Sequence, residues 1–234
     1  MPRKHPQADV AVDAVIFGLD LEAQALRVLL VERATTPHKG SWALPGGYIR
    51  IDESLEDSVH RVLEAKTSMT LTYLEQLYTF GEPTRDPRGR VISVAYFGLV
   101  RPQDFNPHGG GNVKDARWFS IDWQWEFLPM AFDHQRIIKM ALERLRSKVR
   151  WQPVGFGLLP ERFSMGQLQQ VYEILLGRPV DKRNLSSTIK RYGLLLDTGE
   201  REDPKIVRHR PAQLYRFNSD RYRELQVLGV DFEV

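Results

Sequence analysis

The chain has 234 residues, of which 42% are hydrophobic and 27% are charged, as expected for a globular protein with one large or two small domains. It contains no cysteine, which excludes disulfide bonds and cysteine-ligated zinc. No apolar run approaches the roughly 20 residues that span a bilayer, and the N-terminus lacks a secretory apolar core. We therefore expect a cytoplasmic protein with no membrane partner.

Charge is distributed unevenly along the chain. Residues 1–145 carry 17 Lys and Arg against 19 Asp and Glu, whereas residues 146–234 carry 16 against 11. The formal net charge of +3 thus combines a slightly acidic N-terminal part with a basic C-terminal part. This asymmetry favours a polyanion-binding module in the C-terminal part, and a harmless excess of surface charge is the alternative.

The first 150 residues alternate between predicted strands and helices. Apolar or alternating runs predict strands at 10–19, 26–32, 71–80, 91–100 and 117–121. Helical signals cover 54–67, with Ser54 as the expected N-cap, and 133–149, where apolar residues form one stripe. Strands around one central helix, closed by a second, predict an α/β sandwich. Two prolines and two glycines in 151–160 then predict a boundary between domains 1–150 and 151–234.

The second domain has the signals of two helices followed by a hairpin. Ser164 and Gln167 form a predicted capping box, Gly177 ends the first helix, and Asp181 is the expected N-cap of the second. Gly193 ends the second helix, and strands are predicted at 194–197 and 213–217 with a long loop between them. This order predicts an α+β winged helix-turn-helix domain.

Polar and basic side chains are expected on the outward face of the second helix, where they suit a DNA groove. The candidates for base contacts are Arg183, Asn184, Ser187 and Lys190, and Arg183 is the best candidate to read guanine. Phosphate contacts are expected from the helix ends and from the hairpin loop, through Lys182, Arg191, Arg208 and Arg210. The basic loop, which also contains His209, suits phosphates or the minor groove, and Arg210 is the candidate to enter the minor groove. The alternative is a small helical domain that mediates dimerisation.

Residues 47–69, GYIRIDESLEDSVHRVLEAKTSM, resemble a Nudix box, which reads G, five residues, E, seven residues, R-E-U-x-E-E, one residue, G-U, with U apolar. The frame is kept by Gly47, Glu53, Arg61, Leu63 and Met69. The three expected acids are replaced by Val62, Ala65 and Lys66, and the late glycine by Ser68.

The three replaced positions share one helix face, where carboxylates would hold Mg²⁺ and orient a water molecule. Val62 and Ala65 have no metal-binding atoms, and Lys66 places a cation where the metal should bind. We therefore expect no catalytic residues, no metal and no hydrolase activity, and interpret the domain as a sensor. A chance match, or a hydrolase with an unusual metal site, is the alternative.

The flanking segments 35–47, TTPHKGSWALPGG, and 79–100, TFGEPTRDPRGRVISVAYFGLV, resemble the ADP-ribose pyrophosphatase branch of the Nudix superfamily. The resemblance covers about residues 9–145 and implies a Nudix-fold α/β/α sandwich that binds ADP-ribose. The candidate ligand contacts are Arg33, Lys39, Trp42, Gly46, Gly47, Arg61, Arg85, Arg88, Ser93, Tyr96 and His134.

Structural roles compete with several of these assignments. Arg61 is equally suited to pair with Glu53 and brace the box loop, while Trp42 and Tyr96 are suited to core packing. Asp133, beside His134, is suited to start the following helix.

The segments LPERFSMGQLQQVYEILLG, DKRN and RPAQLYRF resemble the C-terminal domain of NrtR, the Nudix-related transcriptional regulators of NAD metabolism. The resemblance implies a dimeric, nucleoid-associated repressor that binds palindromic double-stranded operator DNA near NAD-metabolism genes. ADP-ribose or a related nucleotide would be its effector, bound without being consumed and without a cofactor. The alternatives are an ADP-ribose pyrophosphatase with an appended interaction domain and, more weakly, an RNA-interacting scaffold.

Overall fold

The structure is a computed structural model that describes residues 7–69, 71, 74–122, 124–205 and 210–228. The chain divides into two compact units, one of residues 1–20 and 25–142, the other of residues 21–24 and 143–234. The division falls inside a long helix, α2 (His134–Trp151), and the sequence-based boundary at residue 150 stays a prediction. Within the described ranges, no helix is both long and apolar enough to cross a membrane.

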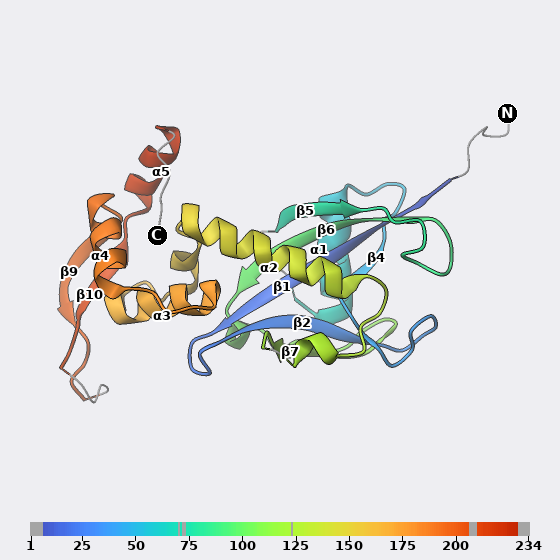
Figure 1. Ribbon diagram of the computed structural model, residues 1–234, viewed down its shortest axis with the longest axis horizontal. Coiled ribbons are helices and arrows are strands. Elements are labelled where there is room, and N and C mark those ends of the chain that lie inside the picture. The colour runs from blue at the N-terminus through green and yellow to red at the C-terminus, as the bar shows by residue number, and fades with distance from the viewer. Residues whose placement is uncertain (1–6, 70, 72–73, 123, 206–209, 229–234) are drawn as a thin grey trace. The chain divides into compact units, whose positions relative to one another are not determined.

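The first unit is built on a seven-stranded sheet (Figure 1). Its central strand, β1 (Asp9–Asp20), pairs in parallel with β6 (Val91–Val100) and antiparallel with β2 (Ala25–Arg33). Strand order is β3-β2-β1-β6-β5, with β4 paired to β1 and β7 paired to β2. These remaining strands are β3 (Trp42–Ala43), β4 (Gly46–Tyr48), β5 (Glu75–Phe80) and β7 (Val113–Ser120).

The strand at 91–100 has the predicted bounds, and those at 10–19 and 26–32 differ from prediction by one residue at each end. The strand predicted at 71–80 begins only at Glu75, and part of its predicted start lies outside the described residues. The strand predicted at 117–121 covers 113–120 instead. Strands β3 and β4 were not predicted, because two or three residues are too few to show an alternating pattern.

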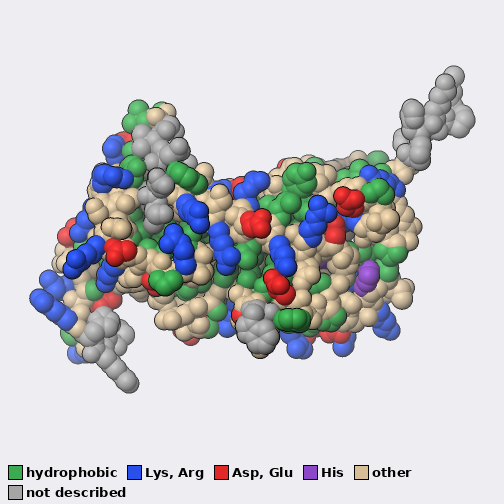
Figure 2. Space-filling view, in the orientation of Figure 1, with side chains coloured by type: hydrophobic (Ala, Val, Ile, Leu, Met, Phe, Trp, Pro, Cys, Tyr) green, Lys and Arg blue, Asp and Glu red, His purple; other side chains and the backbone are tan. Residues whose placement is uncertain are grey.

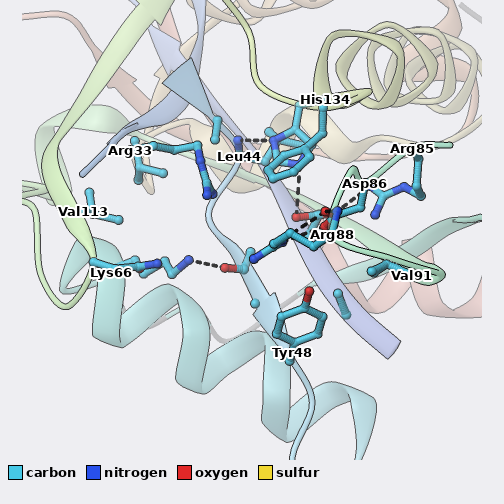
Figure 3. Close-up of a pocket in the computed structure, with 18 residues that line it drawn as sticks. Arg33, Leu44, Tyr48, Lys66, Arg85, Asp86, Arg88, Val91, Val113 and His134 are labelled. Carbon is cyan, nitrogen blue, oxygen red and sulfur yellow. Dashed lines mark hydrogen bonds and ion pairs between the residues drawn. The ribbon is translucent and has the colours of Figure 1, made fainter. Parts of the chain in front are cut away.

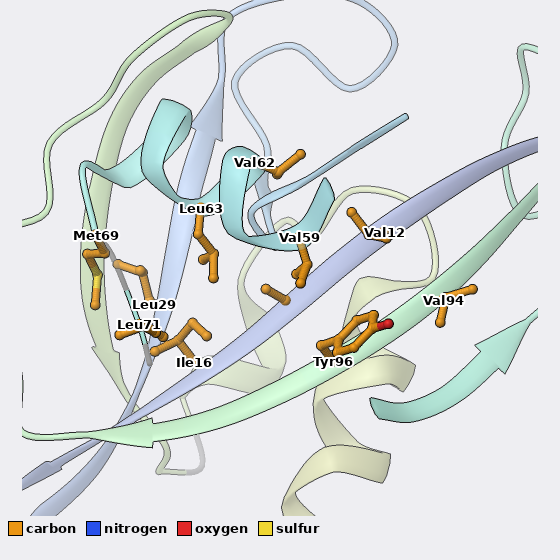
Figure 4. Packing of buried hydrophobic residues seen from close by; sticks show 11 residues of the cluster. Val12, Ile16, Leu29, Val59, Val62, Leu63, Met69, Leu71, Val94 and Tyr96 are labelled. Atoms are coloured by element: carbon orange, nitrogen blue, oxygen red, sulfur yellow. The ribbon is translucent and has the colours of Figure 1, made fainter. Parts of the chain in front are cut away.

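Helices cover the sheet on its two faces, with α1 (Leu55–Thr67) behind it and α2 in front in Figure 1. Ser54 caps α1 as predicted, since its side chain accepts a hydrogen bond from the Asp57 backbone N–H. Val59, Val62 and Leu63 of α1 belong to one buried hydrophobic cluster with residues of β1, β2 and β6 (Figure 4). The predicted apolar stripe of α2 is buried, through Ile137, Ile138, Ala141, Leu142, Leu145 and Val149.

The second unit contains two helices, α3 (Met165–Leu176) and α4 (Lys182–Arg191), followed by a hairpin. The hairpin strands, β9 (Leu195–Arg201) and β10 (Gln213–Phe217), form a three-stranded sheet with β8 (Phe163–Ser164). A further helix, α5 (Ser219–Val227), was not predicted. Short 3-10 helices complete the fold at Pro102–Asp104, Trp125–Phe127 and Val154–Leu158.

Local capping explains where α3 and α4 begin and end. Ser164 and Gln167 form both hydrogen bonds of the predicted capping box, and Gly177 ends α3 with a φ of 66°. The Asp181 side chain accepts a hydrogen bond from the Asn184 backbone N–H at 2.7 Å, which starts α4. The strand predicted at 194–197 was too short, because β9 continues beside β10 as far as Arg201.

Candidate functional site

A pocket in the first unit gathers charged side chains from β1, the end of β2, the end of α1, the loop at 85–88 and the start of α2, and residues of β4 also line it (Figure 3). Six of the eleven predicted ligand contacts line it, namely Arg33, Gly46, Gly47, Arg85, Arg88 and His134. Sequence reasoning missed other lining residues that carry charge or an aromatic ring, namely Asp13, Tyr48, Asp86 and Phe132. Lys66, which was considered only as an obstacle to metal binding, also lines the pocket.

Glycine is required at position 46 by a close approach of two strands. Gly46 pairs with Asp13 across β4 and β1, and a Cβ at Gly46 would lie 1.9 Å from the Asp13 carboxylate. At Gly47, a Cβ would lie 3.2 Å from a methyl group of Val62. Glycine at these positions is therefore needed by the fold itself, whether or not a ligand is bound.

Buried ion pairs form one wall of the pocket. The Arg85 side chain is only 4% exposed, and its Nη2 lies 2.7 Å from the Asp133 carboxylate and 3.4 Å from that of Asp13. Ser93 Oγ donates a hydrogen bond to Asp13. Burial opposes the charge of Arg85, but its bonds to Asp133 and the charge of Asp13 raise its pKa above the usual value. Arg85 thus connects its loop to β1, through Asp13, and to the residue that precedes α2, Asp133.

His134 is buried beside this wall with one ring nitrogen committed to the backbone. Its Nδ1 accepts a hydrogen bond from the Leu44 N–H at 2.9 Å, and its Nε2 lies 3.5 Å from Asp13 Oδ1 (Figure 3). Because Nδ1 is an acceptor, the ring proton is on Nε2, facing Asp13. Burial lowers the pKa of His134 below its usual value, so the ring is neutral at pH 7.

Cations lie close to aromatic rings in the lining of the pocket. The Arg88 guanidinium pairs with Asp86 at 2.6 Å and lies 5.3 Å from the Tyr48 ring centre and 5.5 Å from that of Phe132. The Arg33 guanidinium lies 4.8 Å from the same Phe132 ring. Phe132 has a φ of 54°, an uncommon backbone conformation for a non-glycine residue. Such ring faces attract cations and offer stacking surfaces for a base or sugar.

The three replaced acids of the Nudix box have different surroundings. Val62 is 2% exposed and belongs to the hydrophobic core, whereas Ala65 is exposed. Lys66 is half-buried and its ammonium donates a hydrogen bond to the Gly46 carbonyl (Figure 3). Burial lowers the pKa of Lys66 to about 8. Among the described residues, no group of three or more His, Cys, Asp or Glu is placed to hold a metal ion.

Arg61 braces the box loop. Its guanidinium donates to the Glu53 carboxylate at 2.6 to 2.9 Å and to the Tyr48 carbonyl at 3.2 Å. The hydrogen bonds from Arg61, assisted by one from Ser58, lower the pKa of Glu53 to about 2. This pairing is the structural alternative that the sequence offered, and Arg61 does not line the pocket. A ligand contact by Arg61 stays a prediction.

Four other predicted contacts also lie outside the pocket lining. Lys39 is exposed, and the half-buried Trp42 packs edge-on against Phe119 at 4.5 Å. Ser93 is buried and reaches the pocket only through Asp13. Tyr96 is buried in the core, and its hydroxyl donates to Glu56 at 3.2 Å. Their ligand roles stay predictions.

Helix α4 in the second unit presents polar and basic side chains on one face. Leu185 and Ile189 are buried at 1% and 0% exposure, whereas Arg183, Ser187 and Lys190 are exposed. A shallow hollow is lined by Met165, Lys182, Arg183, Ser186, Ser187 and Lys190. Figure 2 shows lysine and arginine side chains over the α4, β9 and β10 part of the chain.

The remaining predicted DNA contacts flank this face. Asn184 and Arg191 are exposed, and the Arg191 guanidinium lies 5.0 Å from the Tyr192 ring centre. Arg210 is exposed at the end of the hairpin loop. Arg208 and His209 lie outside the described residues. Contact of any of these side chains with DNA stays a prediction.

Comparison with known proteins identifies both parts of the chain. The NUDIX domain model matches residues 8–140, and the model of the NrtR DNA-binding winged helix domain matches residues 155–217. The chain is 34% identical to the ADPR responsive transcriptional repressor NtrR of Acinetobacter baylyi, over 91% of this chain and 83% of that protein. This chain belongs to the NrtR family. Its predicted fold, a Nudix α/β domain followed by a small α+β winged helix domain, is confirmed.

Solved structures of the NrtR family match both parts. The crystal structure of Shewanella oneidensis NrtR complexed with a 27mer DNA has a TM-score of 0.76 and 38% identity, covering 92% of this chain and 95% of that one. The NUDIX domain of Shewanella oneidensis NrtR complexed with ADP ribose has a TM-score of 0.57 and 39% identity, covering 62% of this chain and 93% of that one.

Proposed function

We propose that this NrtR-family chain is an ADP-ribose-responsive transcriptional repressor, whose Nudix domain binds ADP-ribose and whose winged domain binds operator DNA. The observation that carries the proposal is the union, in one chain, of a cationic pocket and an exposed basic helix on a winged fold. The relatives support it, because Shewanella oneidensis NrtR was crystallised with DNA and its Nudix domain with ADP ribose.

The pocket suits a nucleotide with a diphosphate. Four cations line it, namely Arg33, Lys66, Arg85 and Arg88, against the two acids Asp13 and Asp86. An excess of guanidinium and ammonium groups favours phosphate oxygens, which accept charge-assisted hydrogen bonds. The rings of Tyr48 and Phe132 in the lining add faces on which adenine or ribose can pack.

The winged domain suits an operator read mainly through α4. Exposed Arg183, Ser187 and Lys190 share one helix face with the shallow hollow, while Lys182 and Arg191 stand at the helix ends. In a winged helix-turn-helix, this second helix enters the major groove and flanking cations contact phosphates. We propose Arg183 as the main base-reading residue.

In this proposal, the chain acts as a homodimer that binds palindromic operators near NAD-metabolism genes. ADP-ribose favours a dimer arrangement in which the two winged domains have the wrong spacing for DNA. The ligand shifts operator affinity only by its different affinities for the two arrangements, so ADP-ribose and DNA must weaken each other's binding equally. Without the three box acids, the effector is bound and released intact.

A gel shift with DNA from upstream of neighbouring NAD-metabolism genes tests the regulatory role. We expect a shifted band with that DNA, none with scrambled DNA of equal length and salt, and loss of the band when ADP-ribose is added. Equal binding to scrambled DNA, or binding that ADP-ribose does not change, contradicts the proposal. Light scattering of the protein and of its complex tests the dimer, and a monomer on DNA contradicts it.

A hydrolysis assay separates this function from a pyrophosphatase. ADP-ribose incubated with the protein and Mg²⁺ or Mn²⁺ should remain intact, because Val62, Ala65 and Lys66 offer no carboxylate to a metal ion. Turnover above about 1 s⁻¹, an ordinary enzyme rate, would contradict a pure sensor.

A further inference from the structure

Lys66 occupies a position of the box helix that carries a metal-binding acid in a Nudix box. It is the penultimate residue of α1, and its side chain runs along the pocket to the Gly46 carbonyl (Figure 3). Arg33, at the end of β2, extends into the same region from another side. An ammonium group therefore lies at the face of the box helix where a hydrolase would hold a divalent cation.

A neighbouring replaced position, Val62, also offers no ligand to a metal ion. Val62, one turn before Lys66, is 2% exposed and its methyl group faces Gly47. It joins the core formed with Val59 and Leu63, so this position contributes packing to the fold and no charge. The box helix thus has two apolar residues and one cation at the three positions where the Nudix box has acids.

The cations of the pocket differ in how far they are neutralised. Arg85 pairs with Asp133 and Asp13, and Arg88 pairs with Asp86. Among the described residues, neither Arg33 nor Lys66 has a carboxylate within ion-pair distance. Arg33 Nε donates to the Pro37 carbonyl, and Lys66 Nζ donates to that of Gly46. In the part of the chain that the structure describes, Arg33 and Lys66 are therefore the two pocket cations without a carboxylate partner of their own, and the four cations exceed the three acids Asp13, Asp86 and Asp133 by one charge.

The charged forms of these two side chains are disfavoured in the unliganded protein. Burial is the main cause that lowers the pKa of Lys66 to about 8, and the charges of Arg33 and Arg88 lower it further against the attraction of Asp13. The pKa of Arg33 is lowered by burial and by Arg88. An anion placed between Lys66 and Arg33 would relieve this repulsion and raise the pKa of both.

We propose that the Lys66 ammonium replaces the divalent cation of a Nudix hydrolase and, together with Arg33, binds the diphosphate of the effector directly. This inference rests on the proposed function, and it makes nucleotide binding independent of metal. A protonated amine neutralises phosphate charge as a metal does, but it coordinates no water and cannot lower the pKa of an attacking water molecule. One substitution thus both keeps the ligand and protects it from hydrolysis.

Calorimetry on the full-length protein tests the proposal with ADP-ribose as the probe. Wild-type affinity should be the same in EDTA and in excess Mg²⁺. Lys66→Met should weaken binding about 10- to 100-fold, the range for loss of a hydrogen bond to a charged group, and Lys66→Arg should recover part of the loss. Lys139→Met is the matched control, because Lys139 is exposed on α2 and pairs with Glu126. It should bind as the wild type does.

Proton uptake provides a readout that a structural role of Lys66 would not produce. Near pH 8, a diphosphate beside Lys66 should draw a proton onto the partly neutral amine, and calorimetry in buffers of different ionisation enthalpy measures that uptake. Wild type and Lys139→Met should take up protons, and Lys66→Met should take up fewer. This measurement on the wild type remains decisive if Lys66→Met does not fold.

The outcomes separate this inference from the function on which it rests. Wild-type protein that binds no ADP-ribose contradicts the proposed function. ADP-ribose that releases DNA equally well from wild type and from Lys66→Met contradicts only the role of Lys66. Binding by the wild type that disappears in EDTA, or the absence of proton uptake near pH 8, also overturns the inference.

Discussion

The two domains use positive charge in opposite ways. In the Nudix domain a few cations converge inside a pocket, where Arg85 is 4% exposed and Lys66 is half-buried. In the winged domain the cations Arg183 and Lys190 are spread along an exposed helix face. Water and salt screen exposed charges over about 10 Å, whereas buried pairs are screened much less. Each pocket charge should therefore matter more for stability, and each α4 charge mainly for DNA affinity.

The largest expected effect on stability comes from breaking the buried ion pairs. Arg85→Met leaves the carboxylates of Asp133 and Asp13 without their main partner and should lower the free energy of unfolding by about 3–5 kcal/mol. Chemical denaturation measures this change. The matched control is Arg90→Met, an exposed arginine of the same loop, which should change stability by no more than about 0.5 kcal/mol. Equal effects of the two substitutions would contradict the contrast between pocket and surface.

In the winged domain a smaller effect is expected, and it should change DNA affinity without changing stability. Arg183→Ala should weaken operator binding by about 1–3 kcal/mol and relax sequence preference, while leaving the free energy of unfolding nearly unchanged. Fluorescence anisotropy with operator and scrambled DNA at fixed salt measures both quantities. Arg223→Ala, an exposed arginine of α5 that pairs with Asp220, is the control. If operator affinity falls equally for both variants, Arg183 does not read bases.

The smallest expected effect is a dependence of Nudix-domain stability on pH. Burial lowers the pKa of His134 below its ordinary value of 6.5, so as pH falls the unfolded chain binds a proton before the folded protein does. By linkage, the full stability is present above pH 6.5 and part of it is lost as pH falls toward the folded pKa. Denaturation between pH 7.5 and about pH 5 should show this loss.

A substitution isolates the contribution of His134 from that of the carboxylates. His134→Gln removes the titrating ring, so its stability should vary less with pH than that of the wild type over the same range. His60→Gln, at a histidine of α1 outside the pocket lining, serves as the control and should keep the wild-type profile. Parallel profiles for all three proteins would show that the His134 ring does not cause the loss.

Much of the fold was predictable because its signals are local. Ser54, Ser164 and Asp181 each cap a helix through a hydrogen bond to a residue three positions away, so these helix starts are encoded in short segments. The strand at 91–100 is an apolar run interrupted only by Ser93 and Gly98, and the sequence predicts its bounds to the residue. By contrast, β3 and β4 are defined by pairing with other strands, β4 with the distant β1, and their two or three residues carry no periodic pattern.

By itself, the sequence determined the frame of the degenerate Nudix box, the order of the winged domain and the family resemblance that the comparisons confirm. Only the tertiary structure decided the surroundings of each replaced acid, with Val62 in the core, Ala65 exposed and Lys66 in the pocket. Helical spacing places Val62, Ala65 and Lys66 on one helix face, but it does not determine which residues that face contacts. The answer depends on how closely β4 approaches β1 and α1, a contact between segments far apart in the chain.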